Sequence, residues 1–194
     1  MAEYHLKTPI SQSEVKLLKV GDIIYISGTI YTARDLAHRR ITEYIEEGIN
    51  LPIELKGAVI YHCGPIVKRI DGKWRIIAAG PTTSARMEPF ESKLIAKLGI
   101  KMVIGKGGMG YETSQTAKKY GAVYGAFTGG AAAIAATMIK KVEDVKWLNL
   151  GFSEAVWKLK VEEFGPIIVA IDSQGNNLHE RVVEKALKKL REII

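Results

Sequence analysis

Three short segments of the chain combine glycines with hydroxyl or cationic side chains, and each stands where a strand is predicted to pass into a helix. They are residues 80–86 (GPTTSAR), 105–108 (GKGG) and 128–130 (TGG). Such turns direct unpaired backbone N–H groups and the positive end of a helix dipole at one place. Because Arg86 and Lys106 add full positive charge, the three turns together predict a binding site for a small anion.

The first turn holds the most informative side chains. The planar guanidinium of Arg86, near the start of a helix, matches a carboxylate with two parallel N–H donors. Thr82 directly follows Gly80 and Pro81 at the end of a strand, so its hydroxyl is well placed to face a ligand. For Thr83 we expect a hydroxyl that caps the helix.

Another strand-to-helix junction carries Arg34. Arg34 either binds the same ligand or forms a surface ion pair with Asp35 or Glu43. His38 lies one helical turn beyond Arg34 and could face the same site. We interpret His38 as a hydrogen-bonded structural histidine.

His62 stands beside Cys63, the only cysteine of the chain. Two adjacent ligands without a third do not define a metal site, so we interpret both as packing residues or as residues behind the ligand-binding ones. A single cysteine also excludes an internal disulfide and a self-sufficient iron–sulfur cluster, which needs several thiolates. We therefore expect no metal ligand set within this chain.

Residues 105–110 (GKGGMG) match the dinucleotide-binding pattern G-x-G-x-x-G. The acidic residue that would bind the ribose is missing at the end of the next predicted strand, residues 127–128. A P-loop is excluded too, because Gly107 follows Lys106 where serine or threonine is required. The alternative that these glycines, and Gly129 in the third turn, merely tighten their turns stays open.

The composition is that of a globular protein, since 47% of the 194 residues are hydrophobic and 25% are charged. There is no uninterrupted apolar stretch of about 18 residues, and the N-terminus does not resemble a secretory signal. We expect a cytoplasmic protein that does not enter a membrane. Much of the net charge of +7 lies in residues 185–191, on the polar side of a predicted amphipathic surface helix. Because aromatic residues are not interleaved with the basic ones, we expect an anionic substrate or acidic partner rather than nucleic acid.

The elements that must position these residues alternate along the chain. Strands are predicted at residues 22–32, 57–62, 101–104, 122–127, 155–161 and 167–171, and helices at 34–47, 89–98, 112–120, 130–139 and after a turn at 173–176. Asp71-Gly72 predicts a hairpin between 67–70 and 74–79. Because a hairpin and crossover units occur together, we predict a single α/β domain with a mixed sheet over residues 1–194.

Several segments, in order, resemble the β subunit of the iron–sulfur (class I) fumarate hydratases and L(+)-tartrate dehydratases. They are residues 32–38 (TARDLAH), 61–65 (YHCGP), 80–87 (GPTTSARM), 105–108 (GKGG) and 154–157 (EAVW). The resemblance covers nearly the whole chain. In that family this piece is a separate subunit or the C-terminal domain of a longer chain, with a swivelling β/β/α fold.

The resemblance implies a role for each predicted site residue. The side chains that bind the carboxylates of the substrate would be Arg34, Arg86 and Lys106. Thr82 would abstract the proton beside the reacting carbon, and such a weak base needs its alkoxide stabilised by Lys106 and the N–H groups of the turn. Supporting positions are Thr83, Gly107 and Gly129.

The resemblance also implies a partner and a reaction. A 4Fe-4S cluster would be held by three cysteines of an α subunit, and the two chains would form a homo- and hetero-oligomer. The expected reaction is the hydration of fumarate to malate in the tricarboxylic acid cycle. The dehydration of L(+)-tartrate, a substrate that differs by one hydroxyl, is the alternative. An alternative of another class is a non-catalytic module that binds an anion or nucleotide with the same glycine turns.

Overall fold

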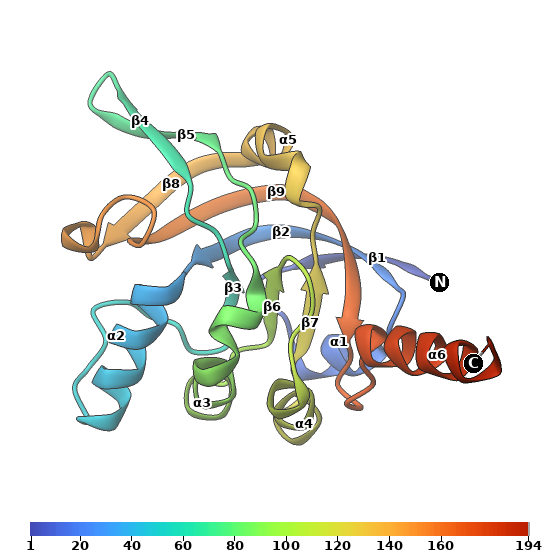
Figure 1. Cartoon of the computed structure of the whole chain (residues 1–194). Helices are drawn as coiled ribbons and strands as arrows, with labels where there is room; N and C mark the ends of the chain where they lie inside the picture. The colour runs from blue at the N-terminus through green and yellow to red at the C-terminus, as the bar shows by residue number, and fades with distance from the viewer. Residues whose placement is uncertain (194) are drawn as a thin grey trace.

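The computed structural model describes residues 1–193 (Figure 1). Its strands are β1 (Glu3–Lys7), β2 (Ile23–Thr32), β3 (Val59–Tyr61), β4 (Ile66–Ile70), β5 (Lys73–Ala78), β6 (Met102–Gly105), β7 (Val123–Ala126), β8 (Ile139–Lys146) and β9 (Val156–Ile171). Its α-helices are α1 (Gln12–Leu17), α2 (Asp35–Glu46), α3 (Glu88–Leu98), α4 (Tyr111–Tyr120), α5 (Ala132–Met138) and α6 (Leu178–Ile193). Short 3₁₀ helices are η1 (Ser84–Met87), η2 (Gly129–Ala131) and η3 (Leu148–Leu150). None of the helices in this part of the chain is long and apolar enough to cross a membrane.

Four parallel strands form the centre of the main sheet, in the order β2, β3, β6 and β7. The long strand β9 pairs antiparallel with β7 and also with β2, so the pairings close into a ring. Strand β1 extends the sheet beside β2, and β8 pairs with β9. The prediction of an α/β fold with a mixed sheet is confirmed. Because the four central strands are parallel, the loops that follow them lie at one edge.

Alternate residues of the parallel strands face two cores. Helices α2, α3 and α4 lie side by side against one face of the sheet, and α5 lies on the opposite side (Figure 1). Ile60 and Val103 face the three helices, whereas their neighbours Tyr61 and Ile104 belong to the core formed with the other strands. Strands that are buried on both faces are typical of a parallel sheet. The two cores fix the strand ends from which the candidate site is built.

Local signals located most of these elements correctly. The hairpin of β4 and β5 turns at Asp71 and Gly72, which have φ angles of 49° and 74°, as a two-residue turn of this type requires. Helix α3 begins with Pro89 in its first turn and ends at Gly99 in the left-handed conformation.

Other predictions were wrong or incomplete. The two strands expected at 155–161 and 167–171 are one continuous strand, β9, because β2 pairs along both halves of it. The helix expected at 130–139 stops at Met138, where the chain enters β8. Elements β1, α1 and β8 were not predicted.

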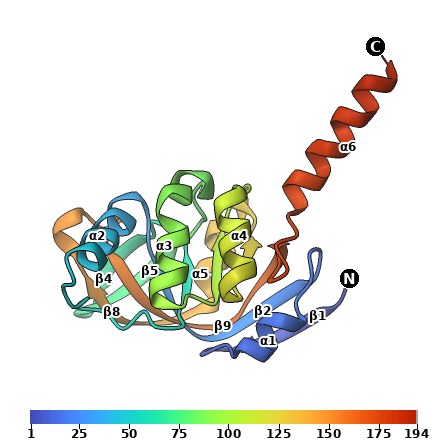
Figure 2. The same ribbon diagram turned by 90° about the horizontal axis from the view of Figure 1, so that it is seen from below.

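The C-terminal helix α6 differs from the predicted surface helix in one respect. It projects away from the rest of the molecule (Figure 2), and none of its described residues is buried. The apolar residues of α6 are therefore exposed to solvent and do not pack against the rest of the domain: Val183 is 56% and Leu187 49% exposed.

Candidate active site

The candidate site begins where the β4–β5 hairpin leaves and rejoins the sheet. The hairpin is inserted after β3, and the chain returns so that the N–H of Thr82 donates to the carbonyl of His62 across 2.7 Å. Cys63 and Pro81 form an isolated antiparallel bridge at the same place. Thr82 therefore lies at the carboxyl end of β3, although 20 residues separate it from His62 in the sequence.

The loop after β6 packs directly against this segment. The N–H of Ser84 donates to the carbonyl of Lys106 across 3.0 Å, and the N–H of Lys106 donates to the carbonyl of Thr82 across 3.3 Å. The Lys106 side chain is exposed, and its stem passes over Gly129 in the loop after β7. A Cβ added to Gly129 would lie 2.8 Å from Cδ of Lys106, so a larger residue there would displace the lysine. The three glycine turns are thus adjacent in space.

Arg86 joins Thr82 to the start of helix α2. Its Nε and Nη2 donate to the two carboxylate oxygens of Asp35 at 3.0 and 3.1 Å. Nη2 also donates to Oγ1 of Thr82 across 2.6 Å. Burial is the largest single influence on the pKa of Asp35 and acts to raise it, but the hydrogen bonds and charge of Arg86, a backbone hydrogen bond and the charge of Arg34 together hold that pKa below its ordinary value. Asp35 is therefore an anion that fixes the plane of the guanidinium.

Arg34 immediately precedes α2 and lies between two carboxylates. Its Nε is 3.4 Å from Oε1 of Glu154, and its Nη2 is 3.6 Å from Oδ2 of Asp35. The predicted pairing with Asp35 is present, whereas Glu43 is not among its partners within residues 1–193. The other oxygen of Glu154 accepts the N–H of Leu36 at 2.9 Å and so caps α2.

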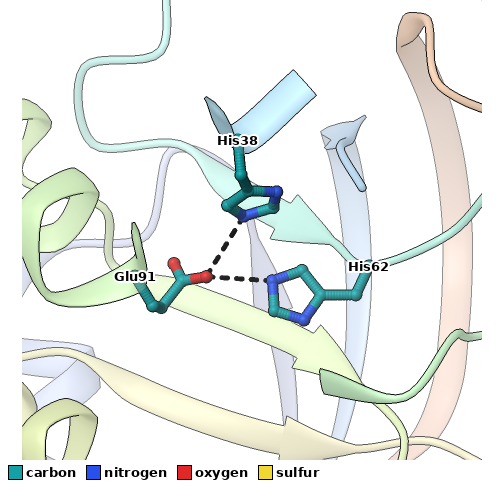
Figure 3. Close-up of side chains that lie close together, drawn as sticks. All are labelled: His38, His62 and Glu91. Atoms are coloured by element: carbon teal, nitrogen blue, oxygen red, sulfur yellow. Dashed lines mark hydrogen bonds and ion pairs between the residues drawn. The ribbon is translucent and has the colours of Figure 1, made fainter. Parts of the chain in front are cut away.

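Behind the loops lies a fully buried polar cluster of His38, His62 and Glu91 (Figure 3). Oε2 of Glu91 is 3.2 Å from Nε2 of His38 and 3.0 Å from Nε2 of His62. Burial acts to raise the pKa of Glu91, but hydrogen bonds from the two imidazoles lower it well below its ordinary value. Burial lowers the pKa of His62. The two histidines are hydrogen-bonded buried residues, as the sequence suggested, but their shared partner Glu91 was missed.

Comparison with known proteins identifies the family. The model described as "Fumarase C-terminus" matches residues 1–182. The chain belongs to the fumarase C-terminus family. It is 47% identical over 186 residues to "Putative L(+)-tartrate dehydratase subunit beta" of Methanocaldococcus jannaschii, and the match covers 95% of each chain. It is 45% identical over 173 residues to "L(+)-tartrate dehydratase subunit beta" of Escherichia coli strain K12, which covers 89% of this chain and 85% of the relative.

A longer relative has the same domain. The chain is 44% identical over 186 residues to "Putative fumarate hydratase class I" of Geobacillus stearothermophilus, and the match covers 95% of this chain but 35% of that one. This member of the fumarase C-terminus family therefore corresponds to β subunits along most of their length and to about a third of the longer protein. The named relatives are all hydro-lyases or subunits of hydro-lyases.

In this fumarase C-terminus domain, one of the predicted anion-binding helix ends already holds an internal carboxylate. Glu88 accepts the N–H of Gly110 at 2.7 Å, the N–H of Thr113 at 3.1 Å and the hydroxyl of Thr113 at 2.8 Å. The expectation that the start of α4 offers free N–H groups to a ligand is therefore wrong. Gly107 has a φ of 76° with no atom near its absent Cβ, so the turn itself needs a glycine there.

The predicted capping role of Thr83 is also wrong. Thr83 occupies the position before η1, but its hydroxyl makes no capping hydrogen bond. The residue pairs with Lys106 as an isolated bridge and is exposed, so its backbone is held as an extra strand residue with the side chain at the surface.

Cys63 does not fit an iron–sulfur cluster. The thiol is completely buried, and burial raises its pKa to about 12. A cysteine ligates a cluster as its thiolate, and a cluster held by cysteines needs several of them. Within residues 1–193 this family member therefore has no ligand set for a cluster.

Proposed function

We propose that this chain is the β subunit of a two-subunit hydro-lyase that reversibly hydrates fumarate to malate, at a site shared with an α subunit. Family membership supports the reaction class. The observation that supports the assignment most directly is the hydrogen bond from Arg86 to the hydroxyl of Thr82, a residue whose backbone is hydrogen-bonded to that of Lys106. A hydroxyl held by a cationic donor is suited to proton transfer next to a carboxylate.

The cationic residues would bind the carboxylates of the substrate. Nε and Nη2 of Arg86 are already bonded to Asp35 and Thr82, so Nη1 is the part of this guanidinium available to a substrate. Lys106 would bind a carboxylate as a point charge. Arg34, between Asp35 and Glu154, would offer its remaining N–H groups.

The charge count indicates why a partner is needed. Three cations, Arg34, Arg86 and Lys106, face two carboxylates, Asp35 and Glu154, which leaves one net positive charge. A dicarboxylate brings two negative charges. We infer that the α subunit supplies the remaining positive charge, together with the 4Fe-4S cluster that Cys63 cannot hold.

Thr82 would act as the base. A threonine hydroxyl ionises only with strong donors around its oxygen, and Nη2 of Arg86 provides a cationic donor at 2.6 Å. The hydroxyl proton of the partly exposed Thr82 would pass to solvent water, and the resulting alkoxide would take a proton from C3 of malate and return it in the hydration direction. Asp35 would hold Arg86 in the orientation that this step needs.

L(+)-tartrate dehydratase is the second candidate. It is supported by the names of the two β-subunit relatives, which align along most of their length with this chain. The two substrates differ by one hydroxyl, which one or two side chains can distinguish.

Anaerobic reconstitution with a cysteine-containing α subunit tests the proposal. The complex is expected to interconvert fumarate and malate, while the chain alone shows no turnover and binds no iron. Faster turnover of L(+)-tartrate than of malate would assign the second candidate. Turnover by the chain alone without iron, or an active-site cluster ligated by this chain, would overturn the assignment.

A further inference from the structure

Hydrogen-bond accounting in the buried cluster requires one proton more than two neutral imidazoles and a carboxylic group without a hydrogen would carry. Nδ1 of His38 lies 2.8 Å from the carbonyl oxygen of Arg34, which can only accept, so Nδ1 carries a hydrogen. Nε2 of the same ring faces the carboxylate oxygen of Glu91 at 3.2 Å. A neutral ring with its hydrogen on Nδ1 would point a lone pair at that oxygen. A hydrogen on Nε2 as well turns this repulsion into a hydrogen bond.

The other imidazole has a different arrangement. Its Nδ1 lies 3.0 Å from Oγ of Ser84, and Oγ accepts the backbone N–H of Lys106 at 3.2 Å. The hydroxyl of Tyr124 lies 2.8 Å from the carbonyl oxygen of Gly107, which can only accept, and 3.1 Å from Oγ of Ser84. We assign its single hydrogen to the shorter contact, the carbonyl of Gly107. Ser84 can then donate to Nδ1 of His62. His62 is left as the neutral tautomer with its hydrogen on Nε2, aimed at Glu91.

Burial makes this arrangement necessary. Glu91 and both histidines have no solvent-accessible surface, and Oε1 of Glu91 has no hydrogen-bond partner within residues 1–193. A buried carboxylate without a compensating charge or proton is strongly unfavourable, because it has lost its hydration. The neighbouring charged residues Arg34 and Asp35 lie outside the cluster and are paired with each other and with surface-side groups. The cluster is therefore neutralised by a proton between Nε2 of His38 and Oε2 of Glu91, and the pKa of Glu91, held well below its ordinary value by the imidazole hydrogen bonds, favours the imidazole as the group that carries it.

We propose that His38, Glu91 and His62 store one proton, as an imidazolium of His38 paired with the carboxylate of Glu91. The pair fixes the tautomer of His62, which orients the hydroxyl of Ser84 and, through it, the N–H of Lys106. The three residues are positioning residues for the loop that joins Thr82 and Lys106. The effect on catalysis rests on the proposed function, whereas the stored proton does not.

The same three side chains offer the ligand atoms of a small metal site. Nε2 of both histidines and one oxygen of Glu91 lie within 4.8 Å of one another. A proton and a divalent metal ion cannot occupy the space between His38 and Glu91 together, because the metal needs the lone pair on which the proton sits. The experiment therefore measures both the protonation of the histidine rings and the metal content.

The decisive measurement is ¹⁵N NMR of the histidine rings in the full chain at pH 7.5, with metal content determined on the same sample. We expect His38 to be protonated on both nitrogens, His62 on Nε2 only, and no stoichiometric metal. A neutral His38, or a bound metal whose removal by a chelator changes both rings, would overturn the proposal. The wild-type spectrum decides this even if a variant fails to fold.

Variants then separate charge storage from positioning. Glu91→Gln should return His38 to the neutral state, while Glu88→Gln on the same helix should leave the ring signals unchanged. Ser84→Ala should leave His38 doubly protonated, because it removes the hydrogen bonds that join His62 to Ser84 and Ser84 to Lys106 but not the pair of His38 and Glu91. An unchanged His38 signal in Glu91→Gln would contradict the pairing.

In the reconstituted complex, Glu91→Gln and Ser84→Ala should each lower kcat by about tenfold to a hundredfold with little change in KM, the range expected for slight misplacement of reacting groups. Wild-type activity in Ser84→Ala would show that the cluster does not position the loop. If the wild-type complex has no hydro-lyase activity, the proposed function fails while the NMR result on the stored proton stands.

Discussion

Arg86 donates a hydrogen bond from Nη2 to Oγ1 of Thr82 across 2.6 Å while its Nε and Nη2 bind both oxygens of Asp35. Two of the three nitrogens of the guanidinium thus bind a residue of the protein, and substrate binding by Arg86 stays a prediction. Asp35 fixes the arginine, and the arginine in turn fixes the hydroxyl. The three residues act as one unit, so substitutions among them should not be additive.

Thr82→Val tests the hydroxyl. It keeps the shape of the side chain and removes the oxygen, so we expect kcat of the reconstituted complex to fall by about 10²–10⁴-fold with little change in substrate affinity. Exchange of the C3 proton of malate with solvent measures the step directly. Thr83→Val is the matched control, because the Thr83 hydroxyl caps no helix and is exposed. Wild-type exchange in Thr82→Val with the cluster intact would mean that another group takes the proton.

Arg86→Lys should be nearly as harmful as Arg86→Ala. A lysine keeps the charge but cannot bind two oxygens of Asp35 and the Thr82 hydroxyl at once, and the lost contacts are worth on the order of 2 to 4 kcal/mol of transition-state free energy. The measurement is kcat/KM. Asp35→Asn should give a smaller loss, since the amide still offers one acceptor oxygen. Near-normal kcat/KM for Arg86→Lys would mean that Arg86 contributes only its positive charge and not the geometry of its hydrogen bonds.

Glu88→Ala should destabilise the fold without involving the candidate site. It removes the carboxylate that accepts two N–H groups and one hydroxyl at the start of α4. The expected loss is about 1 to 3 kcal/mol in the free energy of unfolding. Urea unfolding measures it, with Glu112→Ala as control, because Glu112 is exposed in the first turn of the same helix. Equal effects of the two changes would argue against the cap.

Stability should fall as the pH is lowered. Burial holds the pKa of His62 below the ordinary value of 6.5, so the unfolded chain takes up a proton near that pH while the folded chain does not. The contribution of His62 to the free energy of unfolding is fully present above pH 6.5 and is lost as the pH falls toward the pKa of His62 in the folded state. Urea unfolding at several pH values from neutral downward measures the slope.

A variant at His5 provides the control of opposite sign. Hydrogen bonds that the His5 ring donates to Glu163 and Glu3 raise the pKa of His5, so its contribution to stability is present below its ordinary pKa and is lost as the pH rises. His5→Gln should therefore make the free energy of unfolding fall more steeply as the pH is lowered. A flat pH profile in both proteins would show that neither histidine changes its pKa on folding.

Cys63→Ala should leave the iron and sulfide content of the reconstituted complex unchanged. The thiol is buried and its pKa is raised to about 12, so it is unsuited to ligate a cluster. The small cavity should cost about 1 kcal/mol of stability. Loss of iron on this substitution, with the fold retained, would place a cluster ligand in this chain.

Local patterns were sufficient to predict the parallel strands and the helices between them. Gly99 and Gly121 mark the ends of α3 and α4, and the turn at Asp71-Gly72 marks the hairpin, because each needs a backbone conformation that few residues adopt. Strand β8 was missed since Ile139–Lys146 carries charged residues at most of its exposed positions, as edge strands often do.

The contacts of the candidate site could not be predicted in the same way. Arg86 and Asp35 are 51 residues apart, and no local pattern links them. His38, His62 and Glu91 come from three different elements, so only their packing brings them together. One signal was available: Glu91 lies three and four positions before the buried Leu94 and Ile95 and thus on the buried side of α3.

The pairing of β9 with β2 has a consequence for how the chain acquires its structure. Ile30 pairs with Leu159 and Ile23 with Ile168, so the ring of strands closes between residues that lie far apart in the sequence. Contacts over such long stretches form slowly, because the entropy of the intervening loop is lost before the contact contributes. A ribosome-bound chain that ends before β9 can form the four parallel strands but cannot hold their edges together. The binding loops at those strand ends would therefore become rigid only after the last strand has been synthesised.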